Sequence, residues 1–164
     1  MIKNIKIPEE RLPVLIGKNG MTKRSIQRKT KTKISADEDE IIIEGESIGV
    51  LDAESIIKAI GRGFSPQSAE LLLKEENALV IIELPKGEKT LKRLKSRLIG
   101  TRGKSRRNIE RLTGTHMSVY GKTVALIGTY ENVSLAEQAV QKIIKGMPHR
   151  FVYEFLEARQ NERT

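Results

Sequence analysis

One segment of this sequence occurs twice, and the second copy begins 83 residues after the first. The first copy contains Ile16-Gly17-Lys18-Asn19-Gly20, and the second contains Ile99-Gly100-Thr101-Arg102-Gly103. The same offset aligns Ile26 with Ile109 and, further on, Gly63 with Gly146. One register that holds over about fifty positions indicates a single structural unit present twice. Each unit is therefore expected to be built around a Gly-x-x-Gly loop.

The two copies also share one order of expected elements. In the first copy the hydrophobic pattern predicts a strand at 2–7, helices at 9–16 and 21–30, strands at 31–36 and 40–45, and a helix at 47–60. In the second copy it predicts a strand at 78–84, helices at 88–99 and 104–113, strands at 115–120 and 122–128, and a helix at 130–145. Both copies therefore read strand–helix–helix–strand–strand–helix, which is an α+β pattern.

The repeat also predicts the domain organisation. We expect residues 1–63 and 78–146 to form two domains, with a linker at 64–77 and a C-terminal helix and tail at 147–164. Ser65-Pro66 is typical of a helix N-cap followed by a proline at the first helical position, so the linker is expected to contain a short helix. Phe151 and Phe155 lie one turn apart, which predicts that the last helix packs through them.

Positive charge gathers around both glycine loops. The net charge is +9, and residues 11–33 contain eight Lys or Arg and no acid. Residues 86–111 contain eleven basic side chains and two acidic ones, whereas residues 37–46 contain six acids and no base. This segregation indicates a polyanionic partner at the two loops.

A Gly-x-x-Gly loop between two helices can bind a phosphate backbone. We expect the first glycine to supply a left-handed turn and the second to leave room for another backbone. The next helix begins at once and directs its free N–H groups and positive dipole end towards the loop. Two glycines can also simply form a tight helix–helix turn, but two copies with basic flanks favour a phosphate clamp. The side chains expected around the clamps are Lys18, Asn19, Lys23, Arg24, Thr101, Arg102, Lys104, Arg106 and Arg107.

The Ile-Gly-x-x-Gly motif, set between two helices in this element order, resembles the type I KH domain. The resemblance implies two tandem domains, each a three-stranded sheet with helices on one face, that bind about four unpaired nucleotides. It assigns the clamps to Gly17, Lys18, Asn19 and Gly20, and to Gly100, Thr101, Arg102 and Gly103. It also implies an apolar groove for the bases, walled by Leu15, Ile16, Ile26 and Ile34, and by Leu98, Ile99, Ile109 and Met117. Lys23 and Arg106 stand where KH domains usually have an aliphatic residue, which suggests heavier reliance on phosphate contacts.

The whole chain is similar to the tandem-KH factors of small-ribosomal-subunit biogenesis, the partner-of-Nob-one and Krr-type family, in its archaeal form. The likeness rests on the basic residue after each loop, Gly103-Lys104-Ser105 and the Pro148-His149-Arg150-Phe151 segment. It implies binding to single-stranded RNA at the 3′ end region of small-subunit rRNA. It also implies cooperation with a processing nuclease, a dimethylase, or other assembly and translation-initiation factors.

Other function classes find little support in the sequence. There is no P-loop, dinucleotide fingerprint or nucleophile motif, and no Cys. His116 and His149 have no carboxylate or hydroxyl partner nearby in the sequence, and residues 37–40 are expected to form a solvated acidic turn rather than an ion site. We therefore expect no enzyme activity, no cofactor and no metal. No signal peptide or run of about 20 apolar residues is present, which predicts a cytoplasmic protein without a membrane contact.

Three alternatives remain open from the sequence. The chain could be a general KH binder of the mRNA or exosome type. It could also be a protein–protein scaffold with vestigial clamps, for which residues 37–46 offer the best surface. A nuclease is the third alternative, and no residues in the sequence favour it.

Overall fold

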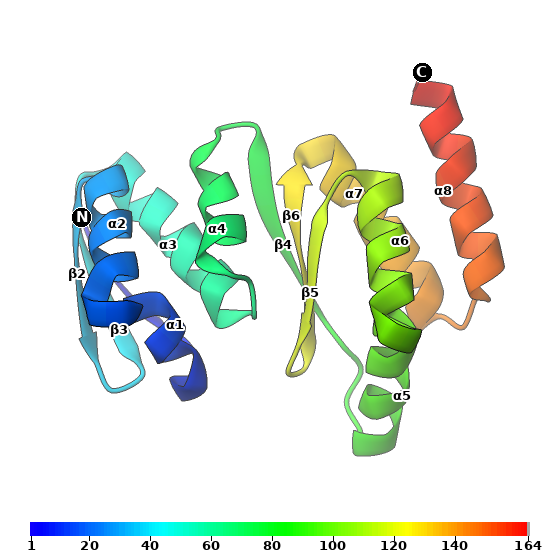
Figure 1. Ribbon diagram of the computed structural model, residues 1–164, viewed down its shortest axis with the longest axis horizontal. Helices are drawn as coiled ribbons and strands as arrows, with labels where there is room; N and C mark the ends of the chain where they lie inside the picture. The colour runs from blue at the N-terminus through cyan, green and yellow to red at the C-terminus, as the bar shows by residue number, and fades with distance from the viewer. Residues whose placement is uncertain (164) are drawn as a thin grey trace. The chain divides into compact units, whose positions relative to one another are not determined.

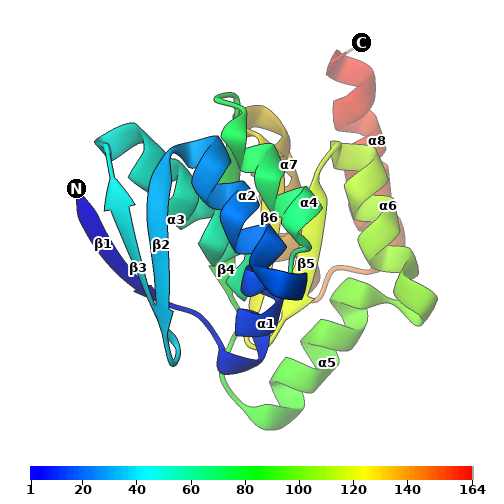
Figure 2. The same cartoon turned by 60° about the vertical axis from the view of Figure 1, so that its left-hand side comes forward.

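The computed structural model describes residues 1–163, and its internal contacts divide the chain into two compact units. The first unit spans Met1–Glu75, and the second begins at Glu76. Each unit contains one three-stranded antiparallel sheet with helices on one face, coloured blue to green in the first unit and green to red in the second (Figures 1 and 2). The expected α+β fold with two repeated domains and a C-terminal helix is confirmed.

The first unit follows the predicted order. Its sheet is arranged β1-β3-β2, and β3 pairs antiparallel with both neighbours. Short 3-10 turns extend the first helix at its start and form the glycine loop. The elements are β1 (Ile2–Lys6), η1 (Glu9–Arg11), α1 (Leu12–Ile16), η2 (Lys18–Gly20), α2 (Met21–Thr30), β2 (Thr32–Asp37), β3 (Glu40–Gly45), α3 (Ser47–Gly61), α4 (Pro66–Ala69) and η3 (Glu70–Leu73).

The second unit repeats this topology with the sheet order β4-β6-β5. Its first helix, α5, is longer than α1, and a further helix, α8, follows the repeated elements. Figure 1 shows α8 alongside α6. The elements are β4 (Asn77–Glu83), α5 (Glu88–Ile99), η4 (Thr101–Gly103), α6 (Lys104–Thr113), β5 (His116–Tyr120), β6 (Thr123–Thr129), α7 (Tyr130–Ile144) and α8 (His149–Arg163).

The repeat extends to individual side-chain contacts in the two cores. Thr30 Oγ1 donates to the Ile26 carbonyl at 2.7 Å, and Thr113 Oγ1 donates to the Ile109 carbonyl at 2.6 Å. Each threonine is buried at the end of its helix, where its hydroxyl needs a partner. The aligned threonines of the sequence are thus explained by one local structure used twice.

The segment between the expected domains packs on the first unit. The Ser65 side chain accepts a hydrogen bond from the Ser68 amide at 3.2 Å, which confirms the expected N-cap. Both α4 and η3 contact α3, and Ala69 and Leu72 are buried. The expected end of the first domain at residue 63 stays a prediction. This packing favours a later domain boundary, near residue 75.

Helix α8 packs on α6 and α7 as expected, and Phe155 contacts the core, but Phe151 does not carry the packing. Val152 and Leu156 are fully buried, whereas Phe151 is 45% exposed and Phe155 is half-buried. The expectation for Phe151 was wrong, because the aliphatic pair one position further along the chain takes the inward face. Helical spacing alone could not separate the two neighbouring pairs.

Candidate nucleic-acid interface

The two glycine loops have nearly the same backbone conformation. Gly17 and Gly100 have φ/ψ of 75°/176° and 76°/173°. Asn19 and Arg102 follow at 55°/28° and 55°/29°, so each loop holds a non-glycine residue in the left-handed region. The loops close with Gly20 and Gly103 at 72°/14° and 74°/16°. The sequence repeat is therefore also a repeat of loop geometry.

The first glycine of each loop is the crowded one. A Cβ atom on Gly17 would collide with Thr22 Oγ1, and one on Gly100 would lie 2.7 Å from the Ser105 amide nitrogen. A Cβ atom on the second glycine would meet only the tip of an arginine side chain. The distance would be 3.2 Å for Gly20 and 3.1 Å for Gly103. No protein backbone within residues 1–163 approaches the second glycine, so the space there stays open and the expected approach of another backbone remains a prediction. It is the first glycine that lets the loop pack on the following helix.

The helices that follow the loops begin with amide groups that no side chain caps. Neither α2 nor α6 has a side-chain hydrogen bond at its N-cap glycine. The two tip residues between the glycines, Lys18-Asn19 and Thr101-Arg102, are exposed. Each of these helix starts places a positive dipole end beside exposed side chains, an arrangement that suits an anion.

One arginine in each unit reaches back over its loop. A Cβ on Gly20 or Gly103 would meet Nη1 of Arg24 or Arg107, which lie at equivalent positions of the repeat. Arg107 Nη1 also donates to the Arg102 carbonyl at 2.5 Å. Arg107 thereby holds the strained tip of the second loop while its exposed guanidinium adds positive charge there.

The other expected phosphate-contacting cations differ in their surroundings. Lys104 is exposed at the start of α6, and Lys23 is half-buried in the first turn of α2. Arg106 lies 3.4 Å from Glu110, so its charge is partly compensated within the helix. Glu110 also accepts a hydrogen bond from the Met117 amide at 2.9 Å. Arg106 therefore contributes less free positive charge than Lys104.

Two residues expected in the base-binding grooves belong to the cores instead. Ile34 and Met117 are each 2% exposed, because they point inward from β2 and β5 against the helices. The expectation that they wall an open groove is corrected. Their expected neighbours in the groove walls are also buried: Leu15, Ile26, Leu98 and Ile109. Ile16 and Ile99, directly before each loop, keep partly exposed side chains.

A groove of about 580 Å³ runs along α5 to the second loop. Its walls include Leu91, Lys92 and Lys95 in addition to Ile99, and it ends at Gly100 and Thr101. Leu91, Lys92 and Lys95 were not among the residues expected to bind RNA. Their helical spacing relative to Ile99 was the available signal, since residues three and four positions apart share one helix face.

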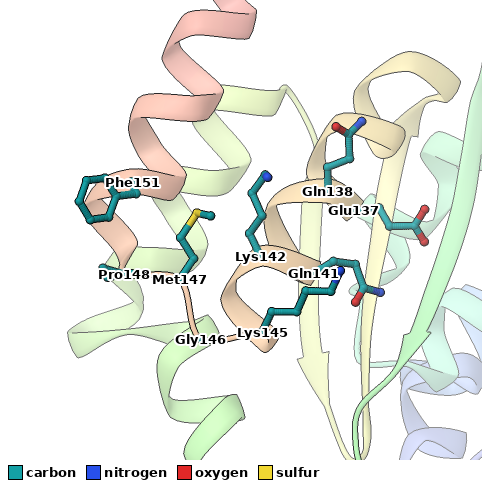
Figure 3. A pocket seen from close by; sticks show the side chains of 9 residues that line it. All are labelled: Glu137, Gln138, Gln141, Lys142, Lys145, Gly146, Met147, Pro148 and Phe151. Atoms are coloured by element: carbon teal, nitrogen blue, oxygen red, sulfur yellow. The ribbon is translucent and has the colours of Figure 1, made fainter.

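A larger hollow of about 910 Å³ lies between α7 and α8, as Figure 3 shows. It is lined by Lys142, Lys145, Met147 and Phe151, together with Glu137, Gln138, Gln141, Gly146 and Pro148. Lys142 Nζ lies 4.5 Å from the centre of the Phe155 ring. No residue expected to bind RNA lines this hollow, so it is separate from the clamps.

Across residues 1–163, no three His, Asp or Glu side chains gather in a way that could hold a metal ion. No helix in that range is long and apolar enough to cross a membrane.

Comparison with known proteins agrees with this architecture. Residues 79–161 match the family described as "Eukaryotic type KH-domain (KH-domain type I)", and residues 2–59 match the KH domain family. The "KH domain-containing protein MJ0443" of Methanocaldococcus jannaschii is 40% identical over 95% of this chain and 73% of its own length. The "RNA-binding protein pno1" of Drosophila pseudoobscura pseudoobscura is 32% identical over 59% of this chain, which spans 43% of that protein.

Among solved structures, one similar chain comes from the "a/eIF2alpha-aDim2p-rRNA complex" of Pyrococcus horikoshii OT3. It has a TM-score of 0.92 and 40% sequence identity, and the match covers 99% of this chain and 95% of that chain. All of these comparisons indicate two KH domains in one chain. They include two family matches, a relative that aligns over nearly the whole chain and a similar solved structure. The chain belongs to the type I KH-domain family, as a tandem-KH protein of the Pno1 and Dim2 group.

Proposed function

We propose that this protein binds single-stranded RNA and holds the 3′ end region of small-subunit rRNA or its precursor through its two Gly-x-x-Gly loops. The observation that carries the proposal is the duplicated loop geometry, in which uncapped helix amides face an exposed basic tip. A phosphate group is the ligand that such a site suits best.

The groove beside the second loop supports a preference for unpaired RNA. It joins the apolar side chains of Leu91 and Ile99 to the cations Lys92 and Lys95. Bases contact apolar surface only when they are unstacked, and phosphates then lie beside the cations. A regular duplex keeps its base edges paired and stacked and cannot use this groove.

The small-subunit rRNA target rests on the relatives. A chain similar over nearly its whole length is part of a complex that contains rRNA, and another relative is named as an RNA-binding protein. We extend this to the 3′ end of the small-subunit rRNA, and to a processing nuclease, a dimethylase or an initiation factor as partners that share the RNA.

Two double variants test the clamps. Each variant places two carboxylates where phosphates are expected to lie. The first combines Lys18→Asp with Asn19→Asp, and the second combines Thr101→Asp with Arg102→Asp. Because like charges repel and counterion release is lost, each should lower affinity for a single-stranded oligonucleotide more than tenfold. The matched control is Lys122→Asp with Ser134→Asp, which makes the same charge change at exposed positions away from the loops. Equal losses in all three proteins would contradict the clamp assignment and favour nonspecific charge attraction.

A further inference from the structure

A third hollow, of about 530 Å³, adjoins the second clamp at Gly100 and Thr101. It is lined by Arg93, Ser96 and Arg97 of α5, Lys104 and Ser105 of α6, His149 and Tyr153 of α8, and the loop residues Gly100 and Thr101. The groove along α5 uses other positions of that helix, but it shares Ser96, Gly100 and Thr101 with this cavity. The two hollows therefore meet at the glycine loop.

The lining of this cavity is basic and rich in hydroxyl groups, and it contains no carboxylate. Arg97 donates to the Ile143 and Met147 carbonyls, so both of its terminal nitrogens already have a protein partner. Arg93 and Lys104 are exposed, and neither forms an ion pair with any other described residue. Two unpaired cations next to an uncapped helix start favour a phosphate group as ligand.

Ser105 provides an independent sign of a missing partner. Its side chain is 3% exposed, and among residues 1–163 its Oγ atom is the buried side-chain oxygen without a hydrogen bond. Leaving a buried hydroxyl unpaired is unfavourable. Because Ser105 lies in the first turn of α6 and lines the cavity, a ligand oxygen there would supply its hydrogen bond.

Helix α8 adds an aromatic wall that the repeated elements do not contain. Tyr153 is half-buried, and its ring centre lies 6.0 Å from that of His149. His149 Nε2 is hydrogen bonded to the Arg97 carbonyl at 2.7 Å, which fixes the start of α8 against α5. A tyrosine ring beside phosphate-binding groups is suited to stack on a nucleobase.

We propose that this cavity binds one nucleotide of the strand held by the second clamp, next to the nucleotides in the α5 groove. Its phosphate lies among Arg93, Lys104 and Ser105, and its base lies against Tyr153. The volume fits one nucleotide with some solvent. This inference rests on the proposed function, because the strand must first occupy the clamp.

A length series of RNA tests the proposal in the full chain. The first clamp is inactivated by Lys18→Asp with Asn19→Asp, and oligouridylates of four to seven nucleotides are then titrated. Extension beyond four nucleotides should raise affinity about tenfold, the scale of one stacked base with its phosphate contact. Arg93→Gln and Tyr153→Leu should remove this gain and leave four-nucleotide binding unchanged. Tyr153→Phe, which keeps the ring, should retain it.

Lys89→Gln on α5 and Phe151→Leu on α8 are the matched controls, because neither residue lines the cavity. Any statistical benefit of a longer strand is common to all variants and cancels in the comparison. An equal gain on extension in Tyr153→Leu and its parent would overturn the proposal, and so would weaker four-nucleotide binding in Tyr153→Leu. Insensitivity of four-nucleotide binding to Thr101→Asp with Arg102→Asp would instead count against the proposed function.

Discussion

Arg11 and Arg97 make the same contact from positions that the sequence repeat does not align. Arg11 donates to the Ile60 and Phe64 carbonyls, both at 2.8 Å, at the end of α3. Arg97 donates to the carbonyls that align with these two, at the end of α7, at 2.5 and 2.7 Å. The residue 83 positions after Arg11 is Leu94. The longer α5 has therefore moved the arginine along the chain while keeping a cation at the carbonyl end of the helix.

Arg97→Gln should destabilise the second unit by about 2 kcal/mol, because two partly buried carbonyls lose charged donors. Urea unfolding of the full chain measures this change. Lys89→Gln, an exposed substitution on the same helix, should change the free energy of unfolding by less than about 0.5 kcal/mol. Equal effects of the two substitutions would contradict the assigned role of Arg97.

The two glycines of each loop should differ in their tolerance of alanine. Gly100→Ala should cost about 3 kcal/mol or more, since its Cβ would collide with the Ser105 backbone in a conformation that essentially only glycine adopts. Gly103→Ala should cost about 1 kcal/mol, since a left-handed residue is strained but only a flexible arginine tip lies close. Thermal unfolding of both variants gives the order, and a larger loss for Gly103→Ala would contradict this account of the loop.

The packing face of α8 can be tested with a pair of truncations. Leu156→Ala should cost about 3 kcal/mol, because a fully buried leucine leaves a cavity. Phe151→Ala should cost less than about 1 kcal/mol, because nearly half of that side chain is exposed. Denaturant midpoints compare the two variants. A larger effect of Phe151→Ala would restore the helix face expected from the sequence.

Much of this architecture could be predicted from the sequence, because the repeat tests each element twice. The strand and helix order, the Ser65 cap and the basic loops all depend on local patterns. The inward positions of Ile34 and Met117 could not be predicted, since a groove wall and a core residue are both aliphatic. The crowding at Gly17 and Gly100 could not be predicted either, because it depends on how closely the loop packs on the start of the following helix. The cavity that Tyr153 lines beside Gly100 likewise exists only because α8 packs on α6.

Binding should depend strongly on salt and on strand state. Each phosphate neutralised on a single strand contributes about −0.7 to the slope of log affinity against log salt concentration. The two clamps together should give a slope of about −3 or steeper. The variant Thr101→Asp with Arg102→Asp loses phosphate contacts and should therefore show a shallower slope. Fluorescence anisotropy at several salt concentrations measures both slopes. A hairpin stem bound as tightly as a single strand would favour the alternative of a protein–protein scaffold with vestigial clamps.

The tandem arrangement should add affinity through effective concentration. If one strand crosses both clamps, binding by the intact chain should exceed that of a single-clamp variant by about 100-fold. The single-clamp variant is Lys18→Asp with Asn19→Asp in the full-length chain. It is preferable to separating the two domains, because a cut at residues 62–66 would disturb the segment that packs on α3. Equal affinity of this variant and its parent for a long strand would show that the clamps do not share one RNA.

A competition between two oligonucleotides of equal length and composition tests whether this chain recognises the 3′ end of small-subunit rRNA. One carries the 3′ end sequence of small-subunit rRNA from the source organism, and the other carries the same bases in scrambled order. Both compete for the intact chain against a labelled 3′ end probe. The 3′ end strand should compete at a concentration at least about tenfold lower, a difference of about 1.4 kcal/mol. Equal competition by the scrambled strand would contradict the assignment to the 3′ end of small-subunit rRNA.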